Sequence, residues 1–179
     1  GMTIAMGQRA ASALLRIHEI LALVPAIADP PHPLRLPQAA VAQPVGAVKF
    51  ENVRFGYEIG HTDIRVLEGF SFSVAPGESV AIVGATGSGK STIARLLLRF
   101  YDPQAGTVSL DGIDLRQLRL PDLRHSVGVV FEDTLLFHDT VSANIAFAKP
   151  EIDFSVVQRA AKLAGAHDFI MQLPNKYDT

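Results

Sequence analysis

A glycine-rich stretch near the middle of the sequence has the residue types and the spacing that bind a triphosphate. It satisfies the pattern G-x-x-x-x-G-K-[ST] with Gly84, Ala85, Thr86, Gly87, Ser88, Gly89, Lys90, Ser91 and Thr92. Glycines allow the backbone to curl around phosphate and to point successive amides at its oxygens. We expect Lys90 to bridge the β- and γ-phosphates, Ser91 to hold Mg²⁺ through its hydroxyl, and Thr92 to approach the α-phosphate. The motif therefore predicts a site for ATP or ADP with Mg²⁺.

The segments on either side of the motif are those that this chemistry requires. Residues 79–83 form a short apolar run typical of a buried strand, and residues 93–101 have the apolar spacing of a helix. A helix that begins at the glycines adds the partial positive charge of its amino terminus. The competing interpretation is a glycine turn that binds nothing, and the Lys-Ser-Thr that follows the glycines argues against it.

Strand and helix patterns alternate through the rest of this region. Strands are predicted at 48–57, 70–74, 107–110 and 127–131, turns at 75–78 and 111–112, and helices at 141–148 and 153–171. The alternation predicts an α/β fold in which helices cover a parallel sheet. Asp111 and Asp114 are expected to act as turn and cap residues, without a catalytic role.

The first 47 residues have a different character. Polar and apolar residues recur at steps of three and four over residues 5–24, which predicts an amphipathic helix. Residues 25–47 hold six of the eleven prolines, which predicts an extended, semi-stiff linker. We therefore divide the chain into a helix at 1–24, a proline-rich linker at 25–47 and a domain at 48–179.

Composition excludes several classes of function. The 179 residues include no cysteine, so disulfides, thiolate metal sites and thiol nucleophiles are ruled out. The net charge of −2 provides no positive field, so nucleic acid is not expected as a partner. The stretches without charge are shorter than the roughly 18–20 apolar residues of a membrane span, and we expect a soluble polypeptide.

From residue 48 onward the sequence resembles the ATP-binding domain of ABC transporters, of the exporter type in particular. Three segments carry the resemblance: VKFENVRFGYE at 48–58, the run from 66 to 118 around the glycine-rich motif, and VGVVFEDTLLFHDTVSANIAF at 127–147. The helix at 1–24 resembles the cytosolic end of the last transmembrane helix. The resemblance implies a P-loop NTPase (RecA-like) ABC ATPase core, incomplete here, with an N-terminal antiparallel β subdomain and a preceding helix.

The resemblance also implies roles for two residues outside the glycine-rich motif. Tyr57 matches the aromatic residue of the A-loop, which stacks on adenine. Glu132 stands where the family has the glutamine of the Q-loop, a residue that helps to hold Mg²⁺. A carboxylate is a hard ligand that still binds Mg²⁺, so Glu132 is expected beside the metal.

The same resemblance implies partners and a location for the parent protein. The expected partners are a second ABC ATP-binding domain, in a homo- or heterodimer, and the membrane-spanning domain of the same transporter. The parent would then lie at the cytoplasmic face of the membrane and couple ATP binding and hydrolysis to export. Residues 132–141, around the Q-loop, would transmit closure of the dimer to the membrane helices.

No catalytic residue of this family is found in the sequence. The signature motif LSGGQ, the Walker B aspartate with its neighbouring glutamate, and the switch histidine have no counterpart in the 179 residues. We therefore expect this polypeptide alone to bind nucleotide weakly and not to hydrolyse it. Two alternatives stay open: a compact P-loop kinase or ATPase with Asp133 as a Walker B-like Mg²⁺ ligand, and a non-catalytic nucleotide-binding or interaction module.

Overall fold

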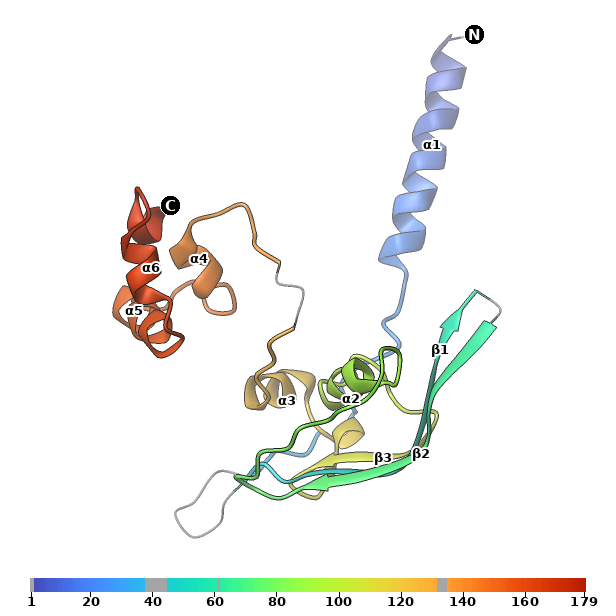
Figure 1. The fold of residues 1–179 in the computed structure, drawn as a ribbon. Helices are drawn as coiled ribbons and strands as arrows, with labels where there is room; N and C mark the ends of the chain where they lie inside the picture. Colours follow the sequence, from blue (N-terminus) through green and yellow to red (C-terminus); the bar gives the residue numbers. More distant parts are fainter. Residues whose placement is uncertain (1, 38–44, 61, 132–134) are drawn as a thin grey trace. The chain divides into compact units, whose positions relative to one another are not determined.

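The computed structural model describes residues 2–37, 45–60, 62–131 and 135–179 (Figure 1). Two compact units are present, Gly1–Val129 and Val130–Thr179. The first unit contains the glycine-rich motif, and the second unit is helical throughout its regular structure.

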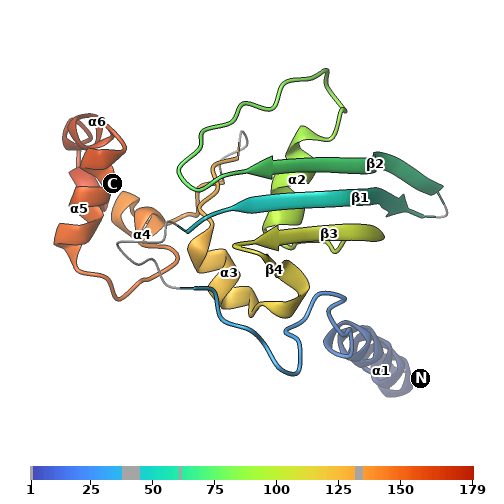
Figure 2. The ribbon, with the colours of Figure 1, turned by 90° about the horizontal axis from the view of Figure 1, so that it is seen from below.

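The first unit is built on a four-stranded antiparallel sheet in the order β2-β1-β3-β4. Its strands are β1 (Val48–Ile59), β2 (Thr62–Val74), β3 (Ala105–Leu110) and β4 (Ile113–Asp114). The first unit also contains helix α2 (Lys90–Leu97), the 3-10 turn η1 (Leu115–Gln117) and helix α3 (Leu120–Ser126). Figure 2 shows β2, β1 and β3 side by side, with α2 across one face.

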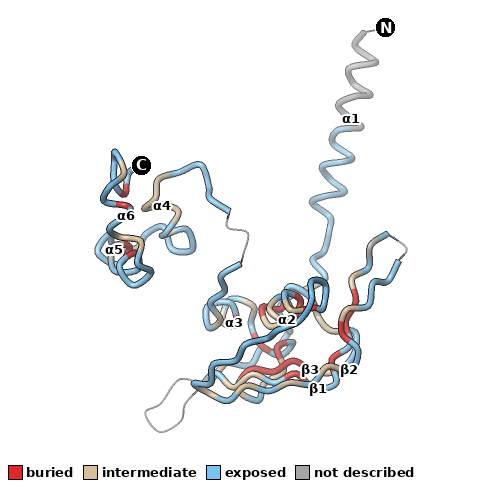
Figure 3. Tube along the Cα trace, viewed as in Figure 1, coloured by how far each residue is buried: buried red, intermediate tan, exposed pale blue. Residues whose placement is uncertain are grey.

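One hydrophobic core joins this sheet face to the helices. Phe50, Val53 and Phe55 of β1 meet residues of α2 at helical spacing, together with residues of β3, η1 and α3 (Figure 3). The buried members include Phe50, Phe55, Leu96, Val108 and Leu118. This packing fixes the helix that follows the glycine-rich motif against the strand that carries Tyr57.

The first predicted strand is confirmed, with an irregularity in its middle. The pairing of β1 with β2 and β3 shifts register around Asn52, whose φ is +49°. Gly106 of β3 lies opposite this bulge, and a Cβ there would lie 2.4 Å from the carbonyl oxygens of Glu51 and Asn52. Only glycine allows the two backbones to approach so closely.

The predicted parallel sheet is not observed among the described residues. Residues 79–83 and 127–131 are extended but form no ladder with another strand, and their side chains are largely exposed. A continuous apolar strand becomes regular when strands on both sides satisfy its amides and carbonyls. Neither segment has such neighbours in the described part of the chain, so the prediction of two inner strands was wrong.

Helix α1 (Met2–Leu21) precedes the sheet, and the proline-rich residues follow it without regular structure up to residue 37. Within the first unit, Leu36 of this stretch packs against the hydrophobic core, and two hydrogen bonds join the stretch to η1 and α3. The Leu34 amide donates to the Gln117 carbonyl at 2.8 Å, and the Asp29 carboxylate accepts from the Leu120 amide at 2.7 Å. None of the helices in the described residues has both the length and the apolar character needed to cross a bilayer. The division at 24/25 and 47/48 stays a prediction.

The second unit contains helices α4 (Val141–Ile145), α5 (Phe154–Leu163) and α6 (His167–Met171), and the 3-10 turn η2 (Lys176–Asp178). Its small core contains Val157, Ala161, Ile170 and Tyr177. The single helix predicted over 153–171 is two helices, because Gly165 adopts a φ of +70° between them.

Candidate nucleotide-binding site

The glycine-rich loop curls back on itself ahead of α2. Gly87 and Gly89 have φ of +85° and +90°, a region that favours glycine. The Ser88 amide donates to the Ala85 carbonyl at 3.2 Å, which closes a turn within the loop. Gly89 is buried, and a Cβ there would lie 2.9 Å from Val66 Cγ1 of β2. The glycine therefore lets the start of α2 approach the sheet.

Lys90 bends over this loop. Its Nζ donates to the carbonyl oxygens of Gly84 at 2.7 Å and Ala85 at 2.8 Å. Residues 81–88 are exposed, so a ligand can reach the loop from solvent. The loop thus combines exposed backbone, a helix amino terminus and an ammonium group, which together fit a polyphosphate.

Ser91 and Thr92 lie in the first turn of α2 and differ in surroundings. Ser91 is exposed, as a ligand of a bound cation must be. Thr92 is buried, and its Oγ1 lies 3.2 Å from the hydroxyl of Tyr57. Its approach to an α-phosphate stays a prediction. The contact joins the end of β1 to the glycine-rich motif, although 35 residues separate the two side chains.

Tyr57 is half-buried in a cluster of three aromatic rings. Its ring makes near-perpendicular contacts with Phe55 and Tyr101, at centroid distances of 4.9 and 5.3 Å. The predicted adenine platform therefore lies next to the predicted phosphate loop. The contact of Tyr101 with Tyr57 was not predicted from the sequence. Tyr101 lies four residues after the end of α2, and nothing in the neighbouring residues indicates that its ring meets β1.

Two further residues were also missed: Gln104, which holds the backbone of Gly56 next to Tyr57, and Arg95, which contacts Tyr57 itself. The Gln104 side-chain amide accepts from the Gly56 amide at 2.7 Å and donates to the Gly56 carbonyl at 3.0 Å. Arg95 Nη1 donates to the Tyr57 hydroxyl at 3.1 Å. This hydrogen bond is the main reason that the pKa of Arg95 is raised above its already high ordinary value.

The two predicted turn and cap aspartates have these roles. Asp111 lies in the turn between β3 and β4, and its carboxylate accepts from the amides of Gly46 and Ala47 at 2.6 and 2.8 Å. Asp114 caps η1 by accepting from the Arg116 amide at 2.9 Å. Burial opposes ionisation of Asp114, but hydrogen bonds from Arg116 outweigh it and lower the pKa of this carboxyl.

Glu132 and Asp133 lie outside the described residues. The structure therefore places neither the expected Q-loop carboxylate nor the Walker B-like carboxylate of the alternative interpretation. Of the two predicted metal-binding residues, only Ser91 is described.

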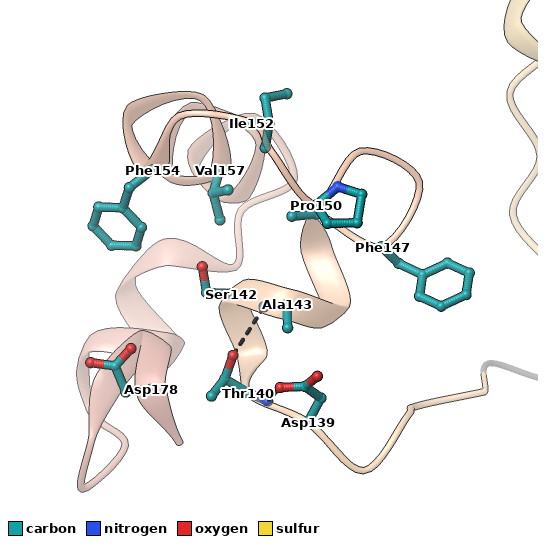
Figure 4. Close-up of a pocket in the computed structure, with 11 residues that line it drawn as sticks. Asp139, Thr140, Ser142, Ala143, Phe147, Pro150, Ile152, Phe154, Val157 and Asp178 are labelled. Atoms are coloured by element: carbon teal, nitrogen blue, oxygen red, sulfur yellow. Dashed lines mark hydrogen bonds between the residues drawn. The ribbon is translucent and has the colours of Figure 1, made fainter.

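The second unit has a pocket of about 450 Å³ (Figure 4). It lies between α4 and the start of α5, and Thr140 caps α4 by accepting from the Ala143 amide at 3.0 Å. Phe147 at its rim is exposed and stacks on Phe137, with ring centroids 4.2 Å apart and planes at 8°. The pocket has a mixed lining, in which Asp139, Ser142 and Asp178 lie beside apolar residues such as Phe147 and Val157.

Comparison with known proteins supports the reading of the glycine-rich loop. The sequence model of the ABC transporter family matches residues 67–178. This chain is 49% identical to an ATP-dependent lipid A-core flippase of Saccharophagus degradans over 142 aligned residues. The aligned residues make up 79% of this chain and 24% of the flippase. It is 46% identical over 153 residues to an ATM1-type heavy metal exporter of Novosphingobium aromaticivorans, covering 86% of this chain and 24% of the exporter.

A solved structure shows the same similarity in three dimensions. A bacterial Atm1-family ABC exporter with ATP bound superposes with a TM-score of 0.82 at 40% identity, over 96% of this chain and 29% of that one. The chain therefore belongs to the ABC transporter family, and it carries part of an ABC ATP-binding domain with the P-loop NTPase fold. It spans about a quarter of the length of the curated relatives described above.

Proposed function

We propose that this chain binds ATP, with the triphosphate in the loop of residues 84–92 and the adenine on Tyr57. The observation that carries the proposal is the contact of Tyr57 with Thr92, because it puts an aromatic ring beside the first turn of the helix that begins at the loop. Lys90 supplies the positive charge for the β- and γ-phosphates. The loop amides and the start of α2 supply the remaining donors.

We further propose that Mg²⁺ binds together with the nucleotide. The Ser91 hydroxyl is exposed in the first turn of α2, where a cation bridging the phosphates would need a ligand. Glu132 is proposed as a second ligand, on the basis of the resemblance. When bound, Mg²⁺ neutralises phosphate charge and orients the phosphate tail.

In the parent protein the domain would act as the ATP-binding part of an exporter subunit. Two such domains would close on ATP at the cytoplasmic face of the membrane, and hydrolysis would reset them. The exposed, stacked pair of Phe137 and Phe147 is proposed as the surface where the second unit contacts the membrane-spanning domain, because exposed aromatic rings favour an apolar partner. The printed names of the relatives refer to lipid A-core and to heavy metals, so the transported substrate is left open.

The nucleotide site can be tested with Lys90→Ala. Binding of ATP to the 179-residue chain is measured by isothermal titration calorimetry with Mg²⁺, for the wild type and for the variant. We expect affinity to fall by at least about 10-fold, because the charge-assisted bonds to the phosphates are lost. Lys162→Ala, on the exposed surface of α5, is the matched control and should leave affinity unchanged.

Hydrolysis is measured in the same samples as phosphate release. We propose that this polypeptide alone releases none, because no residue in the sequence matches the catalytic carboxylate of the family. Phosphate release that survives purification and is lost in Lys90→Ala would contradict this part of the proposal. Equal ATP affinity in the wild type and Lys90→Ala would contradict nucleotide binding at the loop.

A further inference from the structure

Arg95 lies on the same face of α2 as Thr92, one turn further along the helix. Residues three apart in a helix are neighbours on its surface, so both side chains reach the same point of β1. That point is the Tyr57 hydroxyl, which lies 3.2 Å from Thr92 Oγ1 and 3.1 Å from Arg95 Nη1. The phenol oxygen is therefore held by two side chains of the helix that begins at the phosphate loop.

The contacts of the Tyr57 ring define its plane as well. Phe55 and Tyr101 meet it at interplanar angles of 86° and 87°. Ring packing alone leaves an exposed phenol free to move along its contacts, whereas a hydrogen bond at the far end of the ring fixes the direction in which it points. The Arg95 guanidinium suits this task, because it is always charged and has several donors.

We propose that Arg95 is a positioning residue for the nucleobase. Its guanidinium holds the phenol oxygen of Tyr57, so that the ring is already oriented when a nucleotide occupies the phosphate loop. The inference rests on the proposed function, since it concerns the same site. It makes a specific claim: Arg95 acts on the base through Tyr57, and it does not act as a general positive charge for the phosphates.

Two probes separate these roles. ATP contains base, ribose and phosphates, whereas inorganic tripolyphosphate contains the phosphate chain alone. Affinities of the 179-residue chain for each probe with Mg²⁺ are measured by calorimetry for the wild type, Arg95→Gln, Tyr57→Phe and the double variant. Tyr57→Phe keeps the ring and removes only the hydroxyl. Arg159→Gln, at an exposed position of α5, is the matched control for the loss of one positive charge.

We expect Arg95→Gln to weaken ATP binding by roughly 3- to 10-fold, the effect of one exposed charge-assisted hydrogen bond, while tripolyphosphate binding changes by less than about 2-fold. Tyr57→Phe should have at least as large an effect on ATP binding, because it also removes the contact of the hydroxyl with Thr92. The double variant should be no weaker than Tyr57→Phe, because Tyr57→Phe already removes the hydroxyl through which Arg95 acts. Arg159→Gln should bind both probes as the wild type does.

Four results would overturn the inference, and the last of them would also overturn the proposed function. An equal loss for ATP and tripolyphosphate would show that Arg95 serves the phosphates directly. Additive losses in the double variant would show that Arg95 acts independently of the Tyr57 hydroxyl. Unchanged or tighter ATP binding in Arg95→Gln, with a wild type that binds ATP normally, would remove the positioning role and leave the proposed function intact. A wild type that binds neither probe would refute both proposals together.

Discussion

Gln104 controls where the part of β1 next to Tyr57 lies. The Gln104 side chain makes two hydrogen bonds with the backbone of Gly56. The backbone amide of Gln104 donates to the Arg54 carbonyl at 3.0 Å. Beyond Arg54, β1 has no further partner in β3, so these bonds replace a strand-to-strand contact.

Replacement of Gln104 therefore tests the stability of this region. Gln104→Ala is expected to lower the free energy of unfolding by about 1–2 kcal/mol, because two backbone groups lose their partner. Urea denaturation followed by circular dichroism measures the change. Gln172→Ala, at an exposed position after α6, is the control, and an equal loss in both variants would contradict the specific role of Gln104.

The Asp114 carboxyl predicts a pH dependence of stability. Its pKa is lower in the folded state than in the unfolded state, where it is about 4. The stability linked to its ionisation is therefore present above pH 4 and is lost as the pH falls through the lower, folded-state pKa. Asp114→Asn should be less stable than the wild type at pH 7, by up to about 1 kcal/mol for this partly exposed pair.

The difference in free energy of unfolding between the wild type and Asp114→Asn should narrow as the pH is lowered below about 4, because the wild-type carboxyl then becomes neutral. Urea titrations at a series of pH values from 7 to 3 measure it. A constant difference over the whole range would show that ionisation of Asp114 contributes nothing to stability.

At the scale of the elements, the bulge in β1 depends on Gly106. Gly106→Ala is expected to lower the free energy of unfolding by more than about 3 kcal/mol, because a Cβ collides with two carbonyl oxygens and φ is +82°. Gly112→Ala is the matched control: φ there is +80°, but no atom lies within 4 Å of the added Cβ. The free energy of unfolding of Gly112→Ala should fall by only about 1–2 kcal/mol, the cost of a positive φ in a residue with a Cβ. Equal losses in urea denaturation would show that the close approach at Gly106 contributes nothing.

The same elements show which features a sequence can predict. The strand at β1, the turn at Asp111-Gly112 and the glycine-rich turn ahead of α2 were predicted correctly because their signals lie within a few residues of each other. Arg95 and Gln104 were missed because their partners are 38 and 48 residues away in the chain. A polar residue on a helix or in a loop gives no local sign of such a partner.

The strand at 79–83 was predicted incorrectly for a related reason. Its apolar pattern is that of a buried strand, but a strand forms only with neighbours, and the pattern does not say where these lie. The break at Gly165 between α5 and α6 could have been read from the glycine alone, because glycine is common just after a helix.

At the scale of the whole molecule, we predict self-association from the apolar segments at 79–83 and 127–131, which form no ladder with any strand of the described residues. Val83 is 89% exposed and Val130 is 92% exposed, each within an extended apolar run. Sedimentation velocity of the 179-residue chain should show association that rises with concentration, and Val83→Lys and Val130→Lys should each reduce it.

The control for this experiment is Leu163→Lys. Leu163 is 85% exposed but lies at the end of helix α5, where the backbone is already hydrogen-bonded. If the leucine variant reduces association as much as the valine variants do, general hydrophobicity and not open strand backbone causes it. A monomeric wild type at all concentrations would contradict the prediction.

The two bonds from Lys90 to the Gly84 and Ala85 carbonyls affect what a binding measurement reports. When a triphosphate binds the Lys90 ammonium group, the hydrogen bonds from this group to the two carbonyl oxygens must break. Binding therefore replaces one set of hydrogen bonds with another. The measured binding free energy is then the difference between two electrostatic interactions, and it is smaller than that of the ammonium group with the triphosphate alone. Because the bonds from Lys90 are present without a nucleotide, they stabilise the curled conformation of the loop. The same bonds reduce the affinity for the nucleotide, since they must be broken when it binds.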